Sequence, residues 1–408
     1  MLLEIRLSNF YSIKEEVVLD LRAGHNKTQK AEILRDNTFN YNDEQILKSA
    51  AIYGANASGK SSVMSAIRNC CSIVSNSHLN NENDVFDFVP FKFENYSQKP
   101  SRFFIRFVLD KIEYEYSFSL TQTEIVSEEL YYYPNGRRAK IFTRNEANGK
   151  IKKEIYSFGS VISRPMDIAE NTSRKTLYIS RASQMDREIP KAIFNFFDTI
   201  IAFDIGSLLH KTKLVEKLYL ENRNVLTKAL EIADSDIVNI SYRKEKLASK
   251  ESLTGELIFS TFHKANKEIP FSLEEESGGT QILFIAMLFI IDIIKNNKIL
   301  LVDEIEMSLH TKIVEYIIGL FHTKESSAQI IYTTHNTNLL NLNKLRKDQI
   351  YFTNKRDDGS TDLYSLFDYK DFRDNMDLEK AYLQGRFDAI PYINDSVENI
   401  RSILYGKE

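Results

Sequence analysis

The stretch from residue 50 to residue 62 has the residue types and spacing of a phosphate-binding loop. An apolar run ends at Gly54, and Gly59-Lys60-Ser61 follows after four intervening residues, which fits the pattern G-x-x-x-x-G-K-[ST]. Glycines allow backbone conformations that direct several N–H groups at one phosphate, and the N-terminus of the following helix adds partial positive charge. Lys60 is expected to reach the β- and γ-phosphates of a nucleotide, and the Ser61 hydroxyl to bind Mg²⁺. The residues expected to hold the nucleotide are Gly54, Asn56, Ala57, Ser58, Gly59, Lys60, Ser61 and Ser62.

A pair of carboxylates, Asp303 and Glu304, follows the apolar run 299–302. A buried strand that ends in two acidic residues is the Walker B pattern. Asp303 is expected to hold Mg²⁺ directly or through water, and Glu304 to orient and polarise an attacking water. The alternative interpretation is that the two carboxylates only cap the next helix.

Two further signals gain weight from their order after the phosphate loop. His335 follows a third apolar run, 329–334, and a histidine at the end of such a strand can contact a γ-phosphate and sense its loss. Ser277, Gly278 and Gly279 precede an apolar helix, where they offer a second anion cradle. Taken alone, the histidine fits a structural role better than a functional one, and the turn is a weak signal.

The elements that must position these residues alternate between strands and helices. Residues 1–21 predict a two-stranded hairpin, 62–75 a helix after the phosphate loop, and 86–156 an antiparallel sheet. Helical periodicity at 190–201 and 211–233 predicts an arm or lid inserted between the two halves of the nucleotide site.

The expected domain organisation follows from these elements. Residues 1–156 would form the half with the phosphate loop and a β-subdomain, 157–262 a helical insert, and 263–408 the half with the Ser-Gly-Gly turn, the carboxylates and His335. A basic run within 243–250 fits a solvated hairpin better than a nucleic-acid contact.

Composition narrows the possible classes of protein. The 408 residues carry a formal net charge of −4, with 27% charged and 43% hydrophobic residues, so nucleic-acid binding is not indicated by overall charge. The cysteines, Cys70 and Cys71, are adjacent and predicted to pack in the core, which fits a reduced, cytoplasmic protein. The apolar stretch Ile282–Ile294 contains Asp292 and is too short to span a bilayer, so a buried helix and no membrane association are expected.

Taken together, the motifs resemble the ABC-type ATPase heads of the SMC, RecF and OLD group, in which they lie at opposite ends of the chain around an insert. The local sequence is more specifically similar to the RloA-like abortive-infection ATPases of bacterial phage-defence operons. This likeness covers nearly the full chain and is weakest across 157–262. The segments that carry it are Asn9-Phe10, Ser12-Ile13, 276–280, 303–306, 308–310, 333–336 and 381–391.

The resemblance implies a fold and a mechanism. The fold would be α/β, a P-loop ABC-type ATPase head with an antiparallel β-subdomain and an inserted helical arm or lid. Two heads, in a homodimer or a higher homo-oligomer, would sandwich two ATP molecules head to tail with Mg²⁺. The Ser277 turn of one copy would close on the γ-phosphate bound by Lys60 of the other, with Glu304 as the catalytic base and His335 as the switch histidine.

The sequence also departs from related patterns. We place no Q-loop glutamine, because Gln98 is expected in a turn and Gln122 at a strand edge. Too few residues follow His335 for the Toprim domain of the OLD nucleases, and 357–359 fits a hairpin turn. A nuclease or toxin activity is therefore expected on a separate effector protein, with this chain as its sensor or regulator.

Two alternatives stay open. A DNA-repair head of the RecF or SMC type would show DNA-stimulated ATPase activity and salt-sensitive DNA binding through a basic face. A transporter ATPase subunit fits less well, because the insert between the motifs is long.

Overall fold

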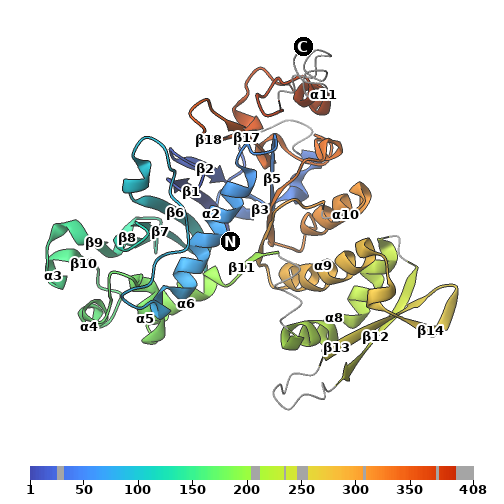
Figure 1. The fold of residues 1–408 in the computed structure, drawn as a ribbon, viewed down its shortest axis with the longest axis horizontal. Helices are drawn as coiled ribbons and strands as arrows, with labels where there is room; N and C mark the ends of the chain where they lie inside the picture. Colours follow the sequence, from blue (N-terminus) through green and yellow to red (C-terminus); the bar gives the residue numbers. More distant parts are fainter. Residues whose placement is uncertain are drawn as a thin grey trace, which may run out of the picture.

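Two β-sheets form the centre of the molecule (Figure 1). The larger has seven antiparallel strands in the order β10-β9-β8-β7-β6-β1-β2. It confirms both the hairpin expected at 1–21 and the antiparallel sheet expected at 86–156. Its strands are β1 (Leu2–Ser8), β2 (Val17–Asp20), β6 (Ser101–Leu109), β7 (Ile112–Leu120), β8 (Ile125–Tyr132), β9 (Ala139–Asn145) and β10 (Tyr156–Phe158). This computed structural model describes residues 1–24, 32–203, 212–233, 236–245, 256–306, 309–373 and 376–391.

The second sheet carries the strands that end at the predicted nucleotide site. Its order is β11-β15-β16-β5-β17-β18, and all neighbours are parallel except β17 and β18. Parallel strands covered on both faces read as near-continuous apolar runs, as β5 and β15 do. Because parallel strands end at one edge, the residues that follow β5, β15 and β16 meet there. The strands are β5 (Ser49–Gly54), β11 (Ile200–Ala202), β15 (Ile299–Val302), β16 (Gln329–Thr333), β17 (Ile350–Lys355) and β18 (Thr361–Ser365).

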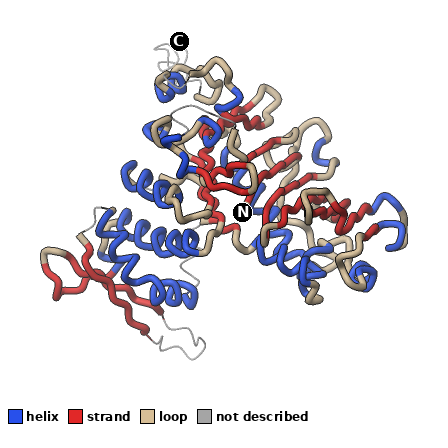
Figure 2. The backbone as a smooth tube through the Cα atoms, turned by 180° about the vertical axis from the view of Figure 1, so that it is seen from behind, coloured by secondary structure: helices blue, strands red, loops and turns tan. Residues whose placement is uncertain are grey.

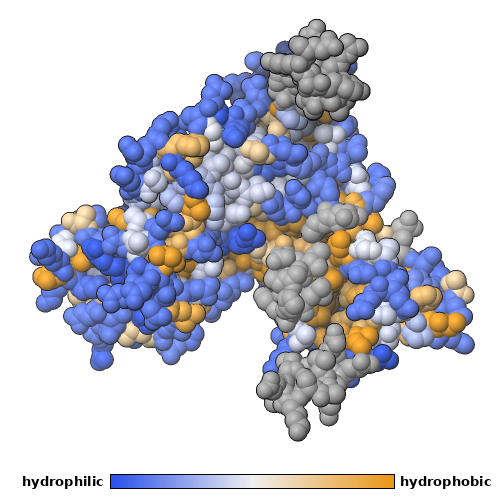
Figure 3. Space-filling model, viewed as in Figure 1, coloured by the Kyte–Doolittle hydropathy of each residue, from blue (hydrophilic) through white to orange (hydrophobic). Residues whose placement is uncertain are grey.

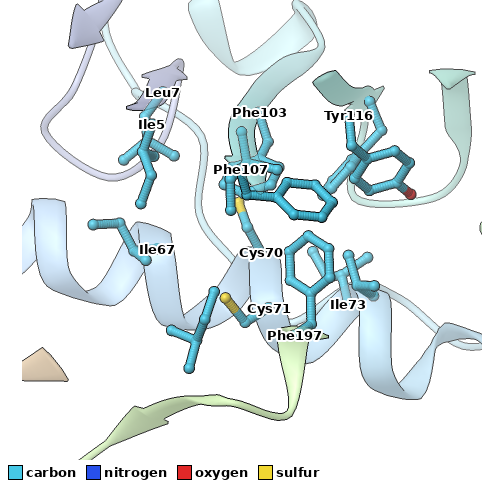
Figure 4. Close-up of a cluster of buried hydrophobic side chains, with 14 of the residues drawn as sticks. Ile5, Leu7, Ile67, Cys70, Cys71, Ile73, Phe103, Phe107, Tyr116 and Phe197 are labelled. Carbon is cyan, nitrogen blue, oxygen red and sulfur yellow. The ribbon is translucent and has the colours of Figure 1, made fainter. Parts of the chain in front are cut away.

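Helix α2 (Lys60–Asn76), predicted at 62–75, lies between the two sheets and contacts β1, β5, β15 and β16. Its apolar face packs with Ile5 and Phe107 of the large sheet (Figure 4). Cys70 and Cys71 are buried in this cluster as free thiols, which confirms their predicted packing role. Burial raises the pKa of the Cys71 thiol to about 12, so it stays protonated and unreactive at neutral pH.

The range 157–202 belongs to the same core as α2. Its helices α5 and α6 contact α2, and the ring of Phe196 on α6 stacks on Phe107 of β6 at 4.3 Å between centroids. Strand β11 then pairs with β15 and joins the six-stranded sheet. This range therefore supports the nucleotide half rather than projecting from it. Its helices are α4 (Pro165–Glu170), α5 (Tyr178–Gln184) and α6 (Glu188–Phe197), and α3 (Lys152–Ile155) precedes them.

The part that projects is a lobe built on α9 (Gly278–Lys295), which we call the insert lobe (Figure 2). Helix α8 (Thr212–Ile232) packs along α9, and a three-stranded antiparallel sheet contacts α8. The lobe thus contains strands as well as the expected helix, and Ile237 and Ile240 of β12 are both buried, three residues apart across a register shift of the strand. The sheet consists of β12 (Ile237–Glu245), β13 (Glu256–His263) and β14 (Asn266–Ser272).

The insert lobe has two further features. Strands β12 and β13 pair antiparallel up to Glu245 and Glu256, as a hairpin at 243–250 requires, while residues 246–255 lie outside the described residues. Helix α9 is long and apolar enough by composition to cross a membrane, but 56% of that stretch is buried inside the protein, as in a core helix. Figure 3 shows hydrophobic residues among hydrophilic ones on this lobe. The large apolar side chains that are exposed on it are Leu214, Leu220, Val225, Ile232, Ile269 and Phe271.

The C-terminal part covers the other side of β5. Strands β17 and β18 form a hairpin whose turn contains Gly359 at φ 80°, which confirms the turn predicted at 357–359. Tyr382 on α11 (Leu378–Leu383) stacks on Phe352 of β17 and meets Tyr53 of β5 edge-on. The remaining elements are the paired strands β3 (Thr38–Tyr41) and β4 (Glu44–Leu47), and α10 (Thr311–Phe321).

Candidate nucleotide-binding site

The phosphate loop closes tightly between β5 and α2. Gly59 caps α2 at φ 108°, where a Cβ would lie 1.9 Å from Thr361 Oγ1, so neither the backbone nor the space admits a side chain. A Cβ at Gly54 would lie 2.3 Å from Thr353 Oγ1. Ala57 at the tip of the loop also has a positive φ, 61°. The two glycines of the sequence pattern thus stand where β17 and β18 approach the loop closely: Gly54 faces Thr353 of β17, and Gly59 faces Thr361 of β18.

Lys60 lies folded into this loop. Its Nζ donates to the carbonyl oxygens of Gly54 and Ala55, both at 2.9 Å, and the residue is only 5% exposed. Burial lowers the pKa of Lys60, while the nearby charges of Asp303 and Glu304 oppose that shift. Among the described residues, the hydrogen-bond acceptors of this buried ammonium are neutral carbonyls, so a phosphate would give it a hydrogen-bonded partner of opposite charge.

Several hydroxyl groups form hydrogen bonds that support the phosphate loop, and the sequence did not predict them. Ser58 Oγ and Thr353 Oγ1 lie 2.6 Å apart, and Thr361 Oγ1 donates to Ser58 O at 3.1 Å. Ser12 Oγ donates to Ser62 Oγ at 2.8 Å and lies 2.7 Å from Thr361 Oγ1. These contacts bring the N-terminal segment and the β17–β18 hairpin to the loop. In the sequence, the only signal that pointed to these contacts is Asn9-Phe10 with Ser12-Ile13.

The carboxylate pair stands at the end of β15, and both side chains are exposed. Thr333 Oγ1 donates to Asp303 Oδ1 at 2.6 Å and accepts the backbone N–H of Glu304 at 2.7 Å. Glu304 has a φ of 55°, a left-handed conformation that a non-glycine residue rarely adopts and that often occurs at functional sites. Thr333 therefore fixes the turn on which both acidic side chains stand.

His335 follows β16, which lies between the strands that carry the phosphate loop and the carboxylates. Partial burial, then the positive charge of Lys60, lowers the pKa of the exposed His335, and the carboxylates Glu306, Glu304 and Asp303, in that order, act against that shift. The lowered pKa favours the neutral imidazole, which can donate one N–H. The mutual electrostatic effects of these groups agree with the strand order: Lys60, Asp303, Glu304 and His335 form one cluster.

The Ser277-Gly278-Gly279 turn stands apart from this cluster. Ser277 caps α9, accepting the backbone N–H of Thr280 at 3.1 Å, and both Ser277 and Gly278 are exposed. A cavity of about 310 Å³ beside the turn is lined by residues of the insert lobe and of 309–313, and by none of residues 54–62. Thus a single chain holds two separate candidate anion cradles.

The two glutamines considered for a Q-loop do not lie at the strand ends of the site. Gln98 is exposed in a short 3-10 turn. Gln122 lies in the turn after β7 and not on a strand edge, because β7 ends at Leu120. The Nε2 of Gln122 donates a hydrogen bond to the carbonyl oxygen of Phe88. The role expected of a Q-loop glutamine therefore stays unassigned.

The residues present fit a nucleotide phosphate with Mg²⁺. The Ser61 hydroxyl and the Asp303 carboxylate are exposed oxygen donors of the kind that Mg²⁺ prefers. Among the described residues, no group of three or more His, Cys, Asp and Glu side chains could hold a metal by itself. A metal bound through few protein ligands plus phosphate oxygens is the usual arrangement for Mg²⁺ in nucleotide sites.

Solved structures with similar chain paths include heads of SMC proteins. One is described as the SMC head bound to the C-terminal winged-helix domain of ScpA; it has a TM-score of 0.46 and 15% identity, over 94% of this chain and 99% of that chain. The SMC head domain from Thermotoga maritima has a TM-score of 0.41 and 14% identity, over 89% and 98%. A Pyrococcus furiosus SMC head with an extended coiled coil, bound to the C-terminal domain of ScpA, has a TM-score of 0.39 and 16% identity, over 94% and 98%. No curated protein sequence matches the chain.

The strand order, with β16 between the phosphate-loop strand and the carboxylate strand, is that of a P-loop ABC-type ATPase head. A family model described as "AAA domain, putative AbiEii toxin, Type IV TA system" matches residues 49–341. That span runs from β5 past His335 and includes both candidate cradles. The chain therefore belongs to this family of AAA-domain P-loop ATPases.

Proposed function

We propose that the protein binds and hydrolyses ATP at a site assembled head to tail from two copies of the chain. Lys60 and its loop from one copy hold the phosphates, and Ser277, Gly278 and Gly279 of the other close on the γ-phosphate. The observation that supports this proposal is the separation of the two cradles within one chain: no residue of 54–62 lines the cavity beside Ser277. ATP then acts as the ligand that stabilises the dimer, and hydrolysis removes the contact.

Each residue of the proposed site has a physical task. Lys60 neutralises charge on the β- and γ-phosphates, and Mg²⁺ held by Ser61 and Asp303 would neutralise more of it. Glu304 orients the attacking water and accepts its proton. Neutral His335 donates its N–H to the γ-phosphate, so that loss of the phosphate removes that hydrogen bond.

The biological role that we propose is that of a cytoplasmic sensor or regulator in a bacterial anti-phage system, controlling a separate effector such as a nuclease or toxin. The family description and the RloA-like segments support it. Deletion in the native host should abolish protection against phage, and pull-down should recover a stoichiometric protein partner. Unchanged phage sensitivity with no partner would refute this role, and DNA-stimulated ATPase activity with salt-sensitive DNA binding would favour a repair function.

Two substitutions separate nucleotide binding from hydrolysis. Lys60→Ala should abolish ATP binding, because it removes the only buried cation of the loop among the described residues. Glu304→Gln should bind ATP but lower kcat by about 10²–10⁴-fold, the usual effect of removing a general base. Calorimetric ATP titration and phosphate release measure the two steps. Glu325→Gln, an exposed glutamate after α10, serves as the matched control.

The dimer proposal makes the Glu304→Gln variant informative in a second way. Since this variant should keep ATP, mass photometry should find dimers with Mg-ATP and monomers without nucleotide. Hydrolysis by Glu304→Gln at the normal rate would overturn the assignment of the base, and nucleotide-independent monomers would overturn the composite site.

A further inference from the structure

Glu306, two residues after Glu304, holds the segment that carries His335. Its Oε1 accepts the backbone N–H of His335 at 2.7 Å and that of Asn336 at 2.8 Å, and it also accepts the Thr334 hydroxyl. One carboxylate oxygen thus receives three donors from three consecutive residues.

This hold acts where the sheet no longer supports the chain. Strand β16 ends at Thr333, so the N–H groups of His335 and Asn336 lie beyond the ladder. Among the described residues, the acceptor that takes both of them is Glu306 Oε1. Because a backbone N–H direction fixes the orientation of its peptide, Glu306 sets the direction in which the His335 side chain leaves the chain.

The second oxygen of the carboxylate marks this position as unusual. Glu306 Oε2 is buried and has no hydrogen-bond partner among the described residues, and the same is true of the hydroxyls of Tyr53 and Tyr332. Both tyrosines are fully buried, and the Glu306 charge contributes to their raised pKa values after the larger effect of burial. A buried carboxylate oxygen without a hydrogen-bond partner lowers the stability of the fold. A carboxylate at this position is therefore better explained by function than by stability.

The carboxylate strand and the histidine strand are also joined residue by residue. Ile305 N donates to Thr333 O at 3.0 Å, which adds to the contacts of Thr333 with Asp303 and Glu304. Glu306 extends this connection by one more step, from Thr333 to His335. The turn that carries the proposed base and the turn that carries the proposed switch are therefore one hydrogen-bonded unit.

We propose that Glu306 is the positioning residue for His335: its carboxylate holds the 334–336 turn so that the imidazole meets the terminal phosphate of the nucleotide. This inference rests on the proposed function for the role of His335, and goes beyond it by naming the group that sets the geometry. Glu306 acts through His335 and does not itself touch the nucleotide.

A matched pair of substitutions distinguishes reach from charge. Glu306→Gln keeps the length of the side chain and an acceptor oxygen, while Glu306→Asp keeps the charge but withdraws it by one methylene. If Glu306 works by holding the turn, Glu306→Gln should retain most of the activity. Glu306→Asp should lower kcat by about 10²-fold, the cost of a displacement of about 1 Å at a reacting group, with little change in KM. Glu325→Asp, at an exposed position, is the control.

A double-mutant cycle shows whether the effect passes through His335. The variant Glu306→Asp/His335→Ala should be no slower than His335→Ala alone, because a residue that only orients the imidazole has nothing left to orient. Losses that multiply in the double variant would overturn the proposal. So would a Glu306→Gln protein as slow as Glu306→Asp, because an acceptor oxygen at full reach would then fail to hold the turn.

Amide hydrogen exchange tests the same hold without any turnover. The N–H groups of His335 and Asn336 should be protected in the wild-type protein and in Glu306→Gln, and should exchange faster in Glu306→Asp with the rest of the fold unchanged. Equal protection in all three proteins would refute the role of Glu306. An inactive wild-type protein, or full kcat in His335→Ala, would instead refute the proposed function and leave the exchange result to decide on Glu306.

Discussion

At the scale of single residues, the site depends on a few side chains whose environment is set by burial and by each other. Lys60 is a buried cation with carbonyl acceptors, close enough to Asp303 and Glu304 for their charges to oppose the lowering of its pKa. Thr333 joins the two acidic residues, and Glu304 stands on a left-handed backbone. Such a strained residue persists only where neighbouring contacts determine it, which here come from the end of β16.

A second buried group titrates far from its usual range and gives a prediction for stability. Burial, and to a smaller extent the charge of Lys48, lowers the pKa of His322 from 6.5 to about 4. Between pH 6.5 and 4 the unfolded chain therefore binds more protons at this residue, so the free energy of unfolding should fall as pH decreases through that window. The free energy of unfolding of His322→Gln should fall less steeply over the same pH range. Urea unfolding at pH 7 and pH 5 measures the difference, and equal slopes in both proteins would contradict the prediction.

At the scale of elements, the nucleotide half is assembled around α2. This helix has one sheet on each side, and α5 and α6 complete the same core. The phosphate loop at its N-terminus is thus fixed by the packing of the helix that follows it. Strands β17 and β18 approach the loop from the other side, through Thr353 and Thr361.

The packing of α6 on β6 can be tested by removing one ring. Phe107 is fully buried and stacks on Phe196, so Phe107→Ala should lower the free energy of unfolding by about 3–5 kcal/mol, the usual cost of such a cavity. Denaturant titration measures the loss. A loss below about 1 kcal/mol would mean that α6 does not belong to this core. Leu220→Ala, at an exposed position on α8, is the control, and its free energy of unfolding should lie within about 0.5 kcal/mol of that of the wild type.

The sequence predicted those elements whose signal is local. The phosphate loop, the carboxylate pair and His335 each follow a short apolar run, and the paired strands at 103–120 flank an obvious turn. Hydrophobic periodicity also predicted α2 and the antiparallel sheet.

Contacts between distant segments could not be predicted in the same way. Thr361 and Ser12 meet at the phosphate loop although they are 349 residues apart. Glu306 is one acidic residue among many until the fold brings it to the backbone of His335, 29 residues later. The core position of 157–202 depends on packing against α2, which no single stretch of sequence reveals.

At the scale of the whole molecule, the proposed mechanism divides the chemistry between the nucleotide half and the insert lobe. Lys60, Glu304 and His335 belong to the first, and Ser277 belongs to the second, at the N-terminus of α9. The insert lobe also carries exposed apolar residues on α8 and β14. The central claim is that the missing half of each site comes from a second copy.

Mixing two inactive variants tests this claim most directly. Lys60→Ala lacks the phosphate cradle, and Ser277→Arg, at an exposed position, blocks the other cradle without altering the core. Each alone should show no ATPase activity. When mixed with Mg-ATP they should regain activity, because a mixed pair contains one site built from an intact loop and an intact turn. Persistent inactivity of the mixture, with both variants folded, or full activity of Ser277→Arg alone, would contradict the composite site.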